Sequence, residues 1–271
     1  MQKVLILQSE KHLAGMTLEE KAHQKFRKRL QQKLNRACAE YGLIEDGDHI
    51  LVGLSGGKDS LALVELLGAR QKIFVPHFKV SATYVSMSNI GYKSDLDYLR
   101  EFCETAGVDF HHVETSFDER VDAEDAKQMH RQKTHCFLCS WYRRKALFDK
   151  AKELGCNKIA LGHHKDDIVE TLLLNLVYQG SFSTIAPRLQ MERFPMTIVR
   201  PLCLIEEKEL AEYAESAGYK KVDRQCPYER ESARAAAKKI VGELEQLNPA
   251  VRDSLWGAMH NVKEGYLPRR R

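Results

Sequence analysis

The segment Leu54–Ser60, written LSGGKDS, places two glycines, a lysine, an aspartate and two serines between two apolar runs. A strand that ends in a glycine-rich turn and leads into a helix exposes backbone N–H groups at the positive end of the helix dipole, which forms a binding site for anions. The segment lacks the spacing of a Walker A loop, G-x-x-x-x-G-K-[ST], and that of G-x-G-x-x-G. We therefore predict a phosphate-binding loop of another class.

The residue types within this loop suit a nucleotide that binds with a metal ion. Gly56 and Gly57 let the main chain approach a phosphate, and Lys58 adds a positive charge. Asp59 would repel a phosphate unless Mg²⁺ lay between them, so Asp59 is the expected magnesium ligand. Hydroxyl donors come from Ser55 and Ser60.

A second candidate site contains cysteines. Cys136 and Cys139 form a CxxC pair, and two thiolates three residues apart at the start of a helix can face one metal. No second CxxC pair exists, and Cys226, followed by a proline in a polar stretch, is the best third ligand. Three cysteines suit a [4Fe–4S] cluster with one open iron, whereas zinc would recruit a histidine as a fourth ligand. A redox-active or purely structural CxxC pair is the other alternative.

The remaining four of the seven cysteines occur singly in apolar or helical surroundings. We expect them to be small core residues with inert thiols, because isolated cysteines behave as small hydrophobic side chains. They are Cys38, Cys103, Cys156 and Cys203.

Alternating apolar runs and amphipathic stretches predict the elements that position these residues. A first helix is capped by Thr17, carries an apolar stripe from Phe26 to Tyr41 and stops at Gly42. After it we expect strands near 49–54, 79–86, 108–114, 158–162 and 196–200, and helices from Asp59, near 93–106, from about 135–139, over 166–178 and near 206–217, followed by two more helices.

This order predicts an α/β fold, an open parallel sheet with helices on both faces and with N-terminal and C-terminal helices. We divide the chain into an N-terminal helical region (1–45), a catalytic domain (46–225) and a C-terminal helical extension (226–271) that carries Cys226.

The loop resembles the PP-loop signature, SGG-x-DS, of the nucleotide α-hydrolases. The resemblance implies a Rossmann-like fold and an enzyme that cleaves ATP to AMP and pyrophosphate by adenylating a substrate. It also implies that the loop holds the pyrophosphate part of ATP. This general family includes amidating, ring-closing and thiolating enzymes, so the loop alone leaves the chemistry open.

The stretches CFLCSWYRRKALFDKAKELG, KIALGHHKDDIVETLLLN, RPL at 200–202 and the late Cys-Pro resemble the TtcA family, the tRNA 2-thiocytidine biosynthesis proteins. The resemblance, from about residue 25 to about 245, implies a [4Fe–4S] cluster on Cys136, Cys139 and Cys226 whose open iron carries the sulfur. It further implies that Gly162 and His163 lie against the nucleotide. By the same resemblance the reaction centre contains Arg143 or Arg144, and Asp167 with Asp166 beside it.

Several alternatives stay open at this point. The absence of zinc-finger CxxC pairs at both ends favours a cytidine-modifying enzyme over a 2-thiouridine-forming relative. No further cysteine follows Cys226, however, so the 2-thiouridine-forming alternative stays open. A lysidine-forming PP-loop ligase without a cluster and a zinc-containing RNA-binding module are the two other candidates. Asp167 could equally be a surface helix cap, and one of His163 and His164 a structural histidine.

The composition bears on partners and location. The formal net charge of +4 is too mild to identify a nucleic-acid partner, but the first helix carries seven basic residues between 21 and 36 and no acid, which predicts contact with tRNA phosphates. We also expect a contribution from Arg269–Arg271, a sulfur donor (cysteine desulfurase or sulfide), a homodimer, no membrane association and a cytoplasmic location. The basic residues of the helix are Lys21, Lys25, Arg27, Lys28, Arg29, Lys33 and Arg36.

Overall fold

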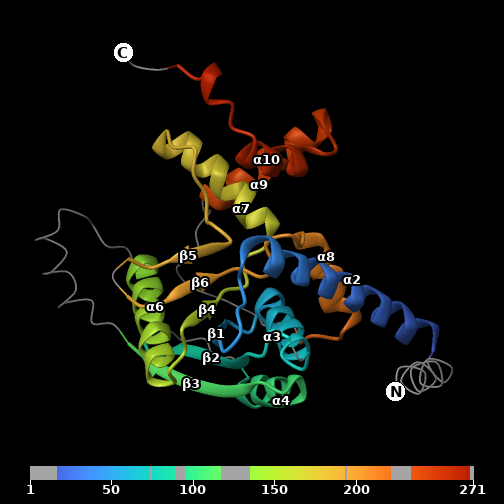
Figure 1. Ribbon diagram of the computed structural model, residues 1–271, viewed down its shortest axis with the longest axis vertical. Helices are drawn as coiled ribbons and strands as arrows, with labels where there is room; N and C mark the ends of the chain where they lie inside the picture. The colour runs from blue at the N-terminus through green and yellow to red at the C-terminus, as the bar shows by residue number, and fades with distance from the viewer. Residues whose placement is uncertain are drawn as a thin grey trace, which may run out of the picture. The chain divides into compact units, whose positions relative to one another are not determined.

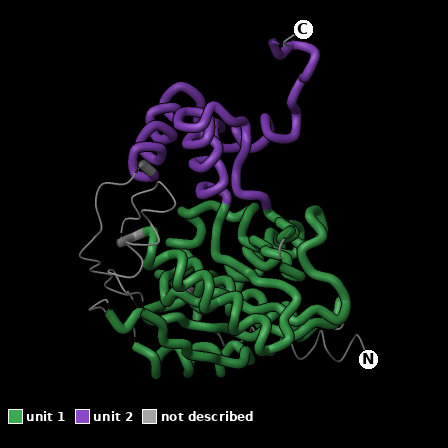
Figure 2. The backbone as a smooth tube through the Cα atoms, turned by 90° about the vertical axis from the view of Figure 1, so that its left-hand side faces the viewer, with its two compact units in different colours: residues 1–164, 187–226 green, residues 165–186, 227–271 purple. Residues whose placement is uncertain are grey.

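The computed structural model describes residues 17–73, 75–89, 95–116, 135–192, 194–220 and 233–268 (Figure 1). The chain divides into two compact units (Figure 2). Unit 1 comprises residues 1–164 and 187–226, and unit 2 comprises residues 165–186 and 227–271. The division into regions 1–45, 46–225 and 226–271 stays a prediction.

Unit 1 contains a six-stranded sheet in the order β3-β2-β1-β4-β6-β5. Five strands are parallel, which confirms the predicted α/β class, and β5 pairs antiparallel with β6 at one edge. The sequence analysis did not predict β5. The strands are β1 (His49–Leu54), β2 (Lys79–Met87), β3 (Asp109–Thr115), β4 (Lys158–Ala160), β5 (Arg188–Gln190) and β6 (Thr197–Val199).

The centre of the sheet is apolar on both faces. Ile50, Leu51 and Val52 of β1 are fully buried, which explains why this strand reads as a continuous apolar run in the sequence. Helices α3 (Lys58–Arg70) and α4 (Leu96–Ala106) follow β1 and β2, and α6 (His135–Glu153) packs on β2, β3 and β4. Because the chain reverses direction across the sheet after β3, α6 covers the face opposite α3 and α4 (Figure 1). A crevice for a ligand is therefore expected where β1 and β4 diverge at their carboxyl ends.

Helix α2 (Leu18–Tyr41) forms as predicted. Thr17 and Glu20 make a reciprocal capping box, and Gly42 ends the helix in the left-handed conformation at φ 58°. The predicted apolar stripe is buried at Leu30, Leu34 and Ala37, and it faces α3 and α8 (Glu207–Ser216).

Unit 2 is helical. It contains α7 (Lys165–Leu174), a π-helical turn η1 (Asn175–Gln179), α9 (Ala233–Leu247), α10 (Val251–His260) and a 3₁₀ turn η2 (Glu264–Tyr266). Val169, Val241 and Val251, one from each long helix, form its core. The helix predicted over 166–178 and the two helices near the C-terminus are thus present, the first with a π-helical end.

The four single cysteines are buried, as predicted. Desolvation raises the pKa of the Cys38, Cys103 and Cys203 thiols to about 12 and that of Cys156 to about 11. These thiols therefore stay protonated at neutral pH and are poor metal ligands and nucleophiles.

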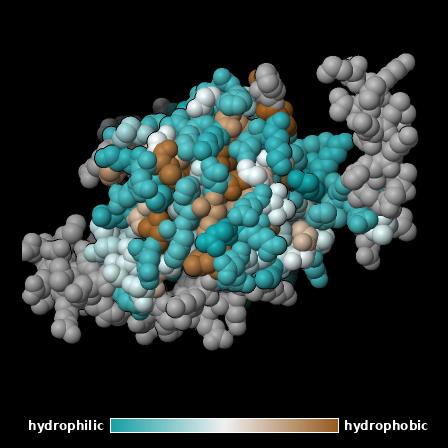
Figure 3. All heavy atoms as spheres, turned by 90° about the horizontal axis from the view of Figure 1, so that it is seen from below, coloured by the Kyte–Doolittle hydropathy of each residue, from teal (hydrophilic) through white to brown (hydrophobic). Residues whose placement is uncertain are grey.

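Most described side chains on the face shown in Figure 3 are hydrophilic, with hydrophobic residues in small separate patches. Among the described helices, none has the length and apolar character that a membrane span requires.

Candidate active site

The loop Leu54–Ser60 joins β1 to α3 at the carboxyl edge of the sheet. Gly56 adopts φ 80°, a left-handed conformation that favours glycine, and Gly57 caps α3 without any side-chain hydrogen bond. The first intrahelical bond of α3 runs from Leu61 N to the Gly57 carbonyl (3.1 Å). The N–H groups before Leu61 therefore have no acceptor one helical turn back, a backbone arrangement that suits the anion site that the sequence predicts.

Ser60 stabilises the shape of this loop from inside. Its buried Oγ accepts from Ser55 N (3.1 Å), contacts Ser55 Oγ (3.1 Å) and donates to the Gly57 carbonyl (2.9 Å). The hydroxyl is thus engaged in the loop itself, and Ser55, which is exposed, is the serine better placed to meet a ligand.

Lys58 and Asp59 lie side by side at the start of α3. Lys58 Nζ lies 3.1 Å from Asp59 Oδ1 and donates a hydrogen bond to Asp59 Oδ2 (3.2 Å), and a second carboxylate, Glu207 Oε1, lies 3.8 Å away. Within the described part of the chain Asp59 Oδ1 is buried and accepts no hydrogen bond, since the bond from the ammonium goes to Oδ2. An oxygen in this state fits the predicted role of Asp59 as a ligand of Mg²⁺.

Gly162 lies against the first turn of α3. A Cβ at this position would stand 3.2 Å from Ser60 N and 3.3 Å from the Asp59 carbonyl carbon. Only a glycine lets the segment after β4 approach the phosphate-binding loop this closely. The next residue, His163, is half-buried beside it, and His164 is buried.

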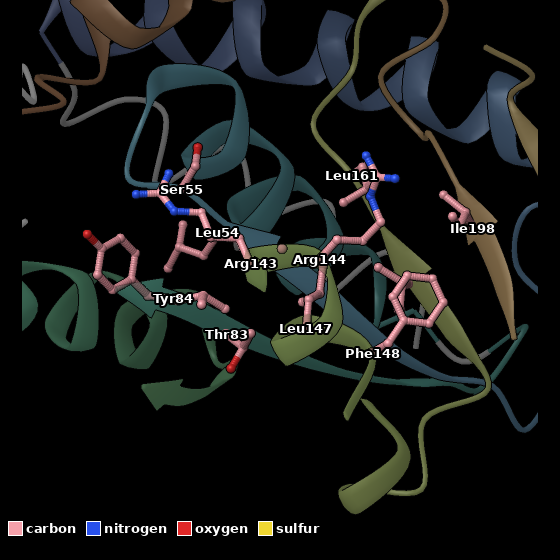
Figure 4. A pocket seen from close by; sticks show the side chains of 13 residues that line it. Leu54, Ser55, Thr83, Tyr84, Arg143, Arg144, Leu147, Phe148, Leu161 and Ile198 are labelled. Carbon is pink, nitrogen blue, oxygen red and sulfur yellow. The ribbon is translucent and has the colours of Figure 1, made fainter. Parts of the chain in front are cut away.

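A cavity of about 210 Å³ opens beside Ser55 (Figure 4). Arg143 extends toward Ser55, whereas Arg144 turns toward Leu161 and Ile198 (Figure 4). The cavity has mostly apolar walls with two guanidinium groups, which suits the flat, apolar faces and polar edges of a nucleoside. Its wall includes Leu54, Thr83, Tyr84, Leu147, Phe148 and Leu161.

Apart from Leu54, which belongs to the predicted loop, the sequence analysis missed these wall residues. Tyr84 pairs with Leu54 in the sheet register, so it sits at the carboxyl end of the neighbouring strand. The signal that could have found it is this position, because parallel strands end together at the ligand-binding edge. To use this position one must know that β2 lies next to β1 in the sheet, and the sequence alone does not give the order of the strands.

Helix α6 brings the cysteine pair and the cavity together. The backbone places Cys136 and Cys139 in its first two turns, and the half-buried Cys139 packs with Met87, Leu138 and Tyr142. Arg143 follows Cys139 by four residues, on the same side of the helix and about 6 Å further along the axis. The Cys136 side chain and all of Cys226 lie outside the described residues, as does Arg269–Arg271. Within the described residues, no group of three or more metal-ligating side chains is present.

Asp166 and Asp167 belong to unit 2, in the first turn of α7. Asp166 is buried and paired with Arg252, while Asp167 Oδ1 lies 3.4 Å from Arg234 Nη2. Burial, with a smaller contribution from the Asp167 charge, raises the pKa of the neighbouring Glu170 to about 7. Both carboxylates are thus ion-paired with arginines of unit 2, and the role expected for Asp167, with Asp166 beside it, stays a prediction.

Carboxylates on α2, α3 and α8 contact part of the basic surface of α2. Arg27 Nε lies 3.1 Å from Glu65 Oε1, and Glu209 accepts ion pairs from Arg29 (3.3 Å) and Lys33 (2.6 Å). Arg36 pairs with Glu40 on the same helix (2.6 Å). The sequence analysis missed these pairs, because the carboxylates that form them lie outside the stretch 21–36. Lys21, Lys25 and Lys28 are exposed.

Comparison with known proteins places the chain in a family. A family model described as a PP-loop domain matches residues 22–241. The tRNA-cytidine(32) 2-sulfurtransferase of Geobacter sulfurreducens is 39% identical over 245 residues, which cover 89% of this chain and 92% of the relative. The chain belongs to the tRNA-cytidine(32) 2-sulfurtransferase family. A second member, from Aeromonas hydrophila, is 34% identical over 250 residues, 92% of this chain and 81% of its own.

A solved structure agrees with this family. The U34-tRNA thiolase NcsA from Methanococcus maripaludis, determined with its [4Fe-4S] cluster, superposes with a TM-score of 0.72 at 27% identity. The match covers 88% of this chain and 78% of the thiolase. The fold of the family is therefore a PP-loop ATPase fold, as the sequence resemblance implies, and the PP-loop domain implies that the chain binds ATP.

Proposed function

We propose that this protein is an ATP-dependent tRNA sulfurtransferase that replaces the C2 oxygen of cytidine 32 in tRNA with sulfur. Membership of the family supports the reaction. The observation that carries the proposal is the path of α6, which holds the CxxC pair at its start and lines the cavity beside the phosphate-binding loop with Arg143 one turn later. A PP-loop ligase that transfers no sulfur would gain nothing from this arrangement.

ATP is the substrate that the loop and the cavity would share. The cavity, continuous with Leu54 and Ser55, would hold the adenosine, and the N–H groups at the start of α3 with Lys58 would hold the phosphates. Mg²⁺ bound by Asp59 would separate that carboxylate from the phosphates and neutralise the charge that develops on pyrophosphate. Gly162 and His163 would border the nucleotide from the other side of the loop.

The C2 carbonyl of cytidine is a poor electrophile, and oxide is a poor leaving group. In the first step the C2 oxygen attacks the α-phosphorus of ATP, the bond from this phosphorus to the bridging oxygen breaks, and pyrophosphate leaves. In the second step a sulfide adds to C2, the C2–O bond breaks, and AMP leaves with the former cytidine oxygen. Arg143, which extends into the cavity near Ser55, would stabilise the negative charge on the α-phosphate in both steps. Asp167 is the candidate general base or second magnesium ligand.

Cys136, Cys139 and Cys226 are the proposed ligands of a [4Fe–4S] cluster. The fit rests on the donor set, because two cysteines three residues apart in the first two turns of a helix face the same side. Cys139 is half-buried in an apolar setting, unlike the four single cysteines, which are buried. When bound, the cluster would supply an open iron from which sulfur is delivered.

The tRNA would be held by its phosphates on the exposed part of α2, where Lys21, Lys25 and Lys28 remain after the ion pairs of the other basic residues are accounted for. The sulfur donor, a homodimer and a cytoplasmic location stay predictions from the sequence.

The test is anaerobic purification of the wild type, Cys139→Ser and the matched control Cys203→Ser, with iron and acid-labile sulfide determined for each. We expect about four irons per chain in the wild type and the control and far fewer in Cys139→Ser. Nucleoside analysis of tRNA treated with each protein should show 2-thiocytidine only where the cluster is present. Absence of iron from the wild type would refute the proposal and favour a ligase or a zinc module, and 2-thiouridine as the product would refute the cytidine assignment.

A further inference from the structure

Two large aromatic side chains are exposed next to the cysteine pair. Phe137 and Trp141, four residues apart on α6, are 49% and 45% exposed. Residues four apart on a helix lie on the same side, with about 5–6 Å between their Cβ atoms. These two rings, called the α6 aromatic pair below, therefore form one continuous surface beside Cys136 and Cys139.

The inner side of the same turns is packed, so the exposure is not caused by a loose helix. Leu138 is 7% exposed and forms an apolar cluster with Met87, Cys139 and Tyr142. The Trp141 ring packs against the edge of Tyr142, with 4.8 Å between centroids and 79° between planes. The indole thus contacts a neighbour on α6 that itself packs against the cluster of Met87 and Leu138.

The charge around the pair is positive. The next turn of α6 carries the exposed Lys145, whose Nζ lies 3.6 Å from Asp149 Oδ2 at the solvent-exposed surface. Arg144 precedes it and turns toward the cavity (Figure 4), and no acidic residue occurs in α6 before Asp149. Aromatic side chains that alternate with basic ones are typical of surfaces that bind single-stranded RNA, because every base has a face that can stack and every nucleotide carries a phosphate. A protein partner that covered two apolar rings would not need this positive border.

We infer that the α6 aromatic pair stacks on unpaired bases of the tRNA substrate, while Lys145 faces a phosphate that flanks them. This inference rests on the proposed function and names where its substrate is held. The chemistry requires such a surface, because C2 of the target base can be reached only when the base is unstacked from its neighbours, and the neighbours then need new stacking partners. Loss of a stacked aromatic weakens single-strand binding by about 5- to 150-fold.

Tryptophan fluorescence tests the inference without removing a ring. The chain has two tryptophans, so in a Trp256→Phe background Trp141 is the sole reporter. We expect saturable quenching on addition of tRNA, with the midpoint found by filter binding, and the same quenching with a short single-stranded oligonucleotide at higher concentration. An unchanged Trp141 signal at saturating tRNA would overturn the inference, whatever the activity of the protein.

Substitutions provide a second test of the inference. Trp141→Ala and Phe137→Ala should each weaken tRNA binding about 5-fold or more, while Trp141→Phe, which keeps a ring, should retain most of the affinity. The slope of binding against salt concentration should stay unchanged in the ring variants and fall in Lys145→Gln, because only the lysine releases counterions. Tyr178→Ala, which removes a 69% exposed aromatic from unit 2, is the control and should bind normally.

Two further readouts separate this inference from the proposed function. Iron content, measured for every variant, should remain at the wild-type value, since neither ring is a ligand. If the wild type forms no 2-thiocytidine, the proposed function fails even when Trp141 is quenched. If the wild type forms it while both alanine variants bind tRNA as tightly as the wild type, the inference about the α6 aromatic pair fails alone.

Discussion

Replacement of Gly162 by alanine should disturb the phosphate-binding loop without unfolding the protein. The added Cβ would lie 3.2 Å from Ser60 N, 3.3 Å from the Asp59 carbonyl carbon and 3.4 Å from its oxygen. All three are backbone atoms of the first turn of α3, so no flexible side chain can move aside. The N–H groups that we assign to the phosphates must therefore shift by a few tenths of an ångström.

The size of the effect follows from this shift. A misplacement of about 1 Å near a reacting centre can cost about 100-fold in rate, so a shift of about 0.3 Å should cost about 4-fold if the logarithm of the rate falls in proportion. We expect kcat/KM for ATP in 2-thiocytidine formation to fall by about this factor in Gly162→Ala. Gly162→Val, whose branched side chain cannot be relieved so cheaply, should lose more than 10-fold.

Two other glycines provide matched controls. At Gly242 in α9 an added Cβ meets nothing within 4 Å, so alanine should leave kcat/KM unchanged and stabilise the helix by about 0.5–1 kcal/mol. At Gly68 in α3 it would lie 2.5 Å from the Ala106 carbonyl oxygen, so alanine should lower the free energy of unfolding by about 1–3 kcal/mol. Steady-state kinetics and urea unfolding separate the two effects. Wild-type kinetics in both Gly162 variants would refute the assignment of this loop.

Three further predictions concern stability and tRNA affinity. Lys158→Met should lower the free energy of unfolding in urea by about 3–5 kcal/mol, because it leaves Asp48, 2.7 Å from the buried ammonium, without its cation. The control Lys79→Met breaks an exposed pair with Asp109 and should cost less than about 1 kcal/mol. Equal losses in the two variants would contradict this prediction. The pKa of Glu170 is raised to about 7 in the folded state, so this carboxyl favours folding below its unfolded pKa, and that contribution is lost as the pH rises through 7. Glu170→Gln should therefore gain stability relative to the wild type between pH 5 and 8. Urea midpoints of the two proteins that stay parallel across that range would disprove this prediction. The third variant replaces the exposed lysines of α2 by glutamine: Lys21, Lys25 and Lys28. It should lower the slope of log K for tRNA binding against log salt concentration by about 2–3, measured by filter binding. An unchanged slope would place the phosphate contacts elsewhere.

The fold and the loop could be predicted because local signals define them. The alternation of apolar runs and amphipathic helices specified the parallel sheet, and Thr17 and Gly42 marked both ends of α2. The three-residue strand β5 gave no such signal, since all its residues are exposed and it pairs with β6 at the edge of the sheet that the structure describes. An edge strand this short depends on its neighbour, not on its own pattern.

Long-range contacts explain what the sequence could not reveal about the site. The ion pair of Arg27 with Glu65 and that of Lys33 with Glu209 reduce the basic surface that the α2 sequence suggests, and both join residues far apart in the chain. The sequence analysis expected the Ser60 hydroxyl to donate to a ligand. In the structure this hydroxyl instead makes hydrogen bonds within its own loop. The roles of Lys58, Asp59, Arg143 and the three cluster cysteines stay predictions, and the iron determination above tests that of Cys139.

The measurement that tests the central claim most directly is the product balance of a single anaerobic reaction with unmodified tRNA, ATP, Mg²⁺ and sulfide. The tRNA should carry ¹⁸O at C2 of its cytidines, and nucleosides and nucleotides should be analysed by mass spectrometry. We predict one AMP and one pyrophosphate for each 2-thiocytidine formed, no ADP, and the ¹⁸O label in AMP. Formation of ADP, or of 2-thiocytidine with unlabelled AMP, would contradict adenylation of the cytidine oxygen and with it the account of this site.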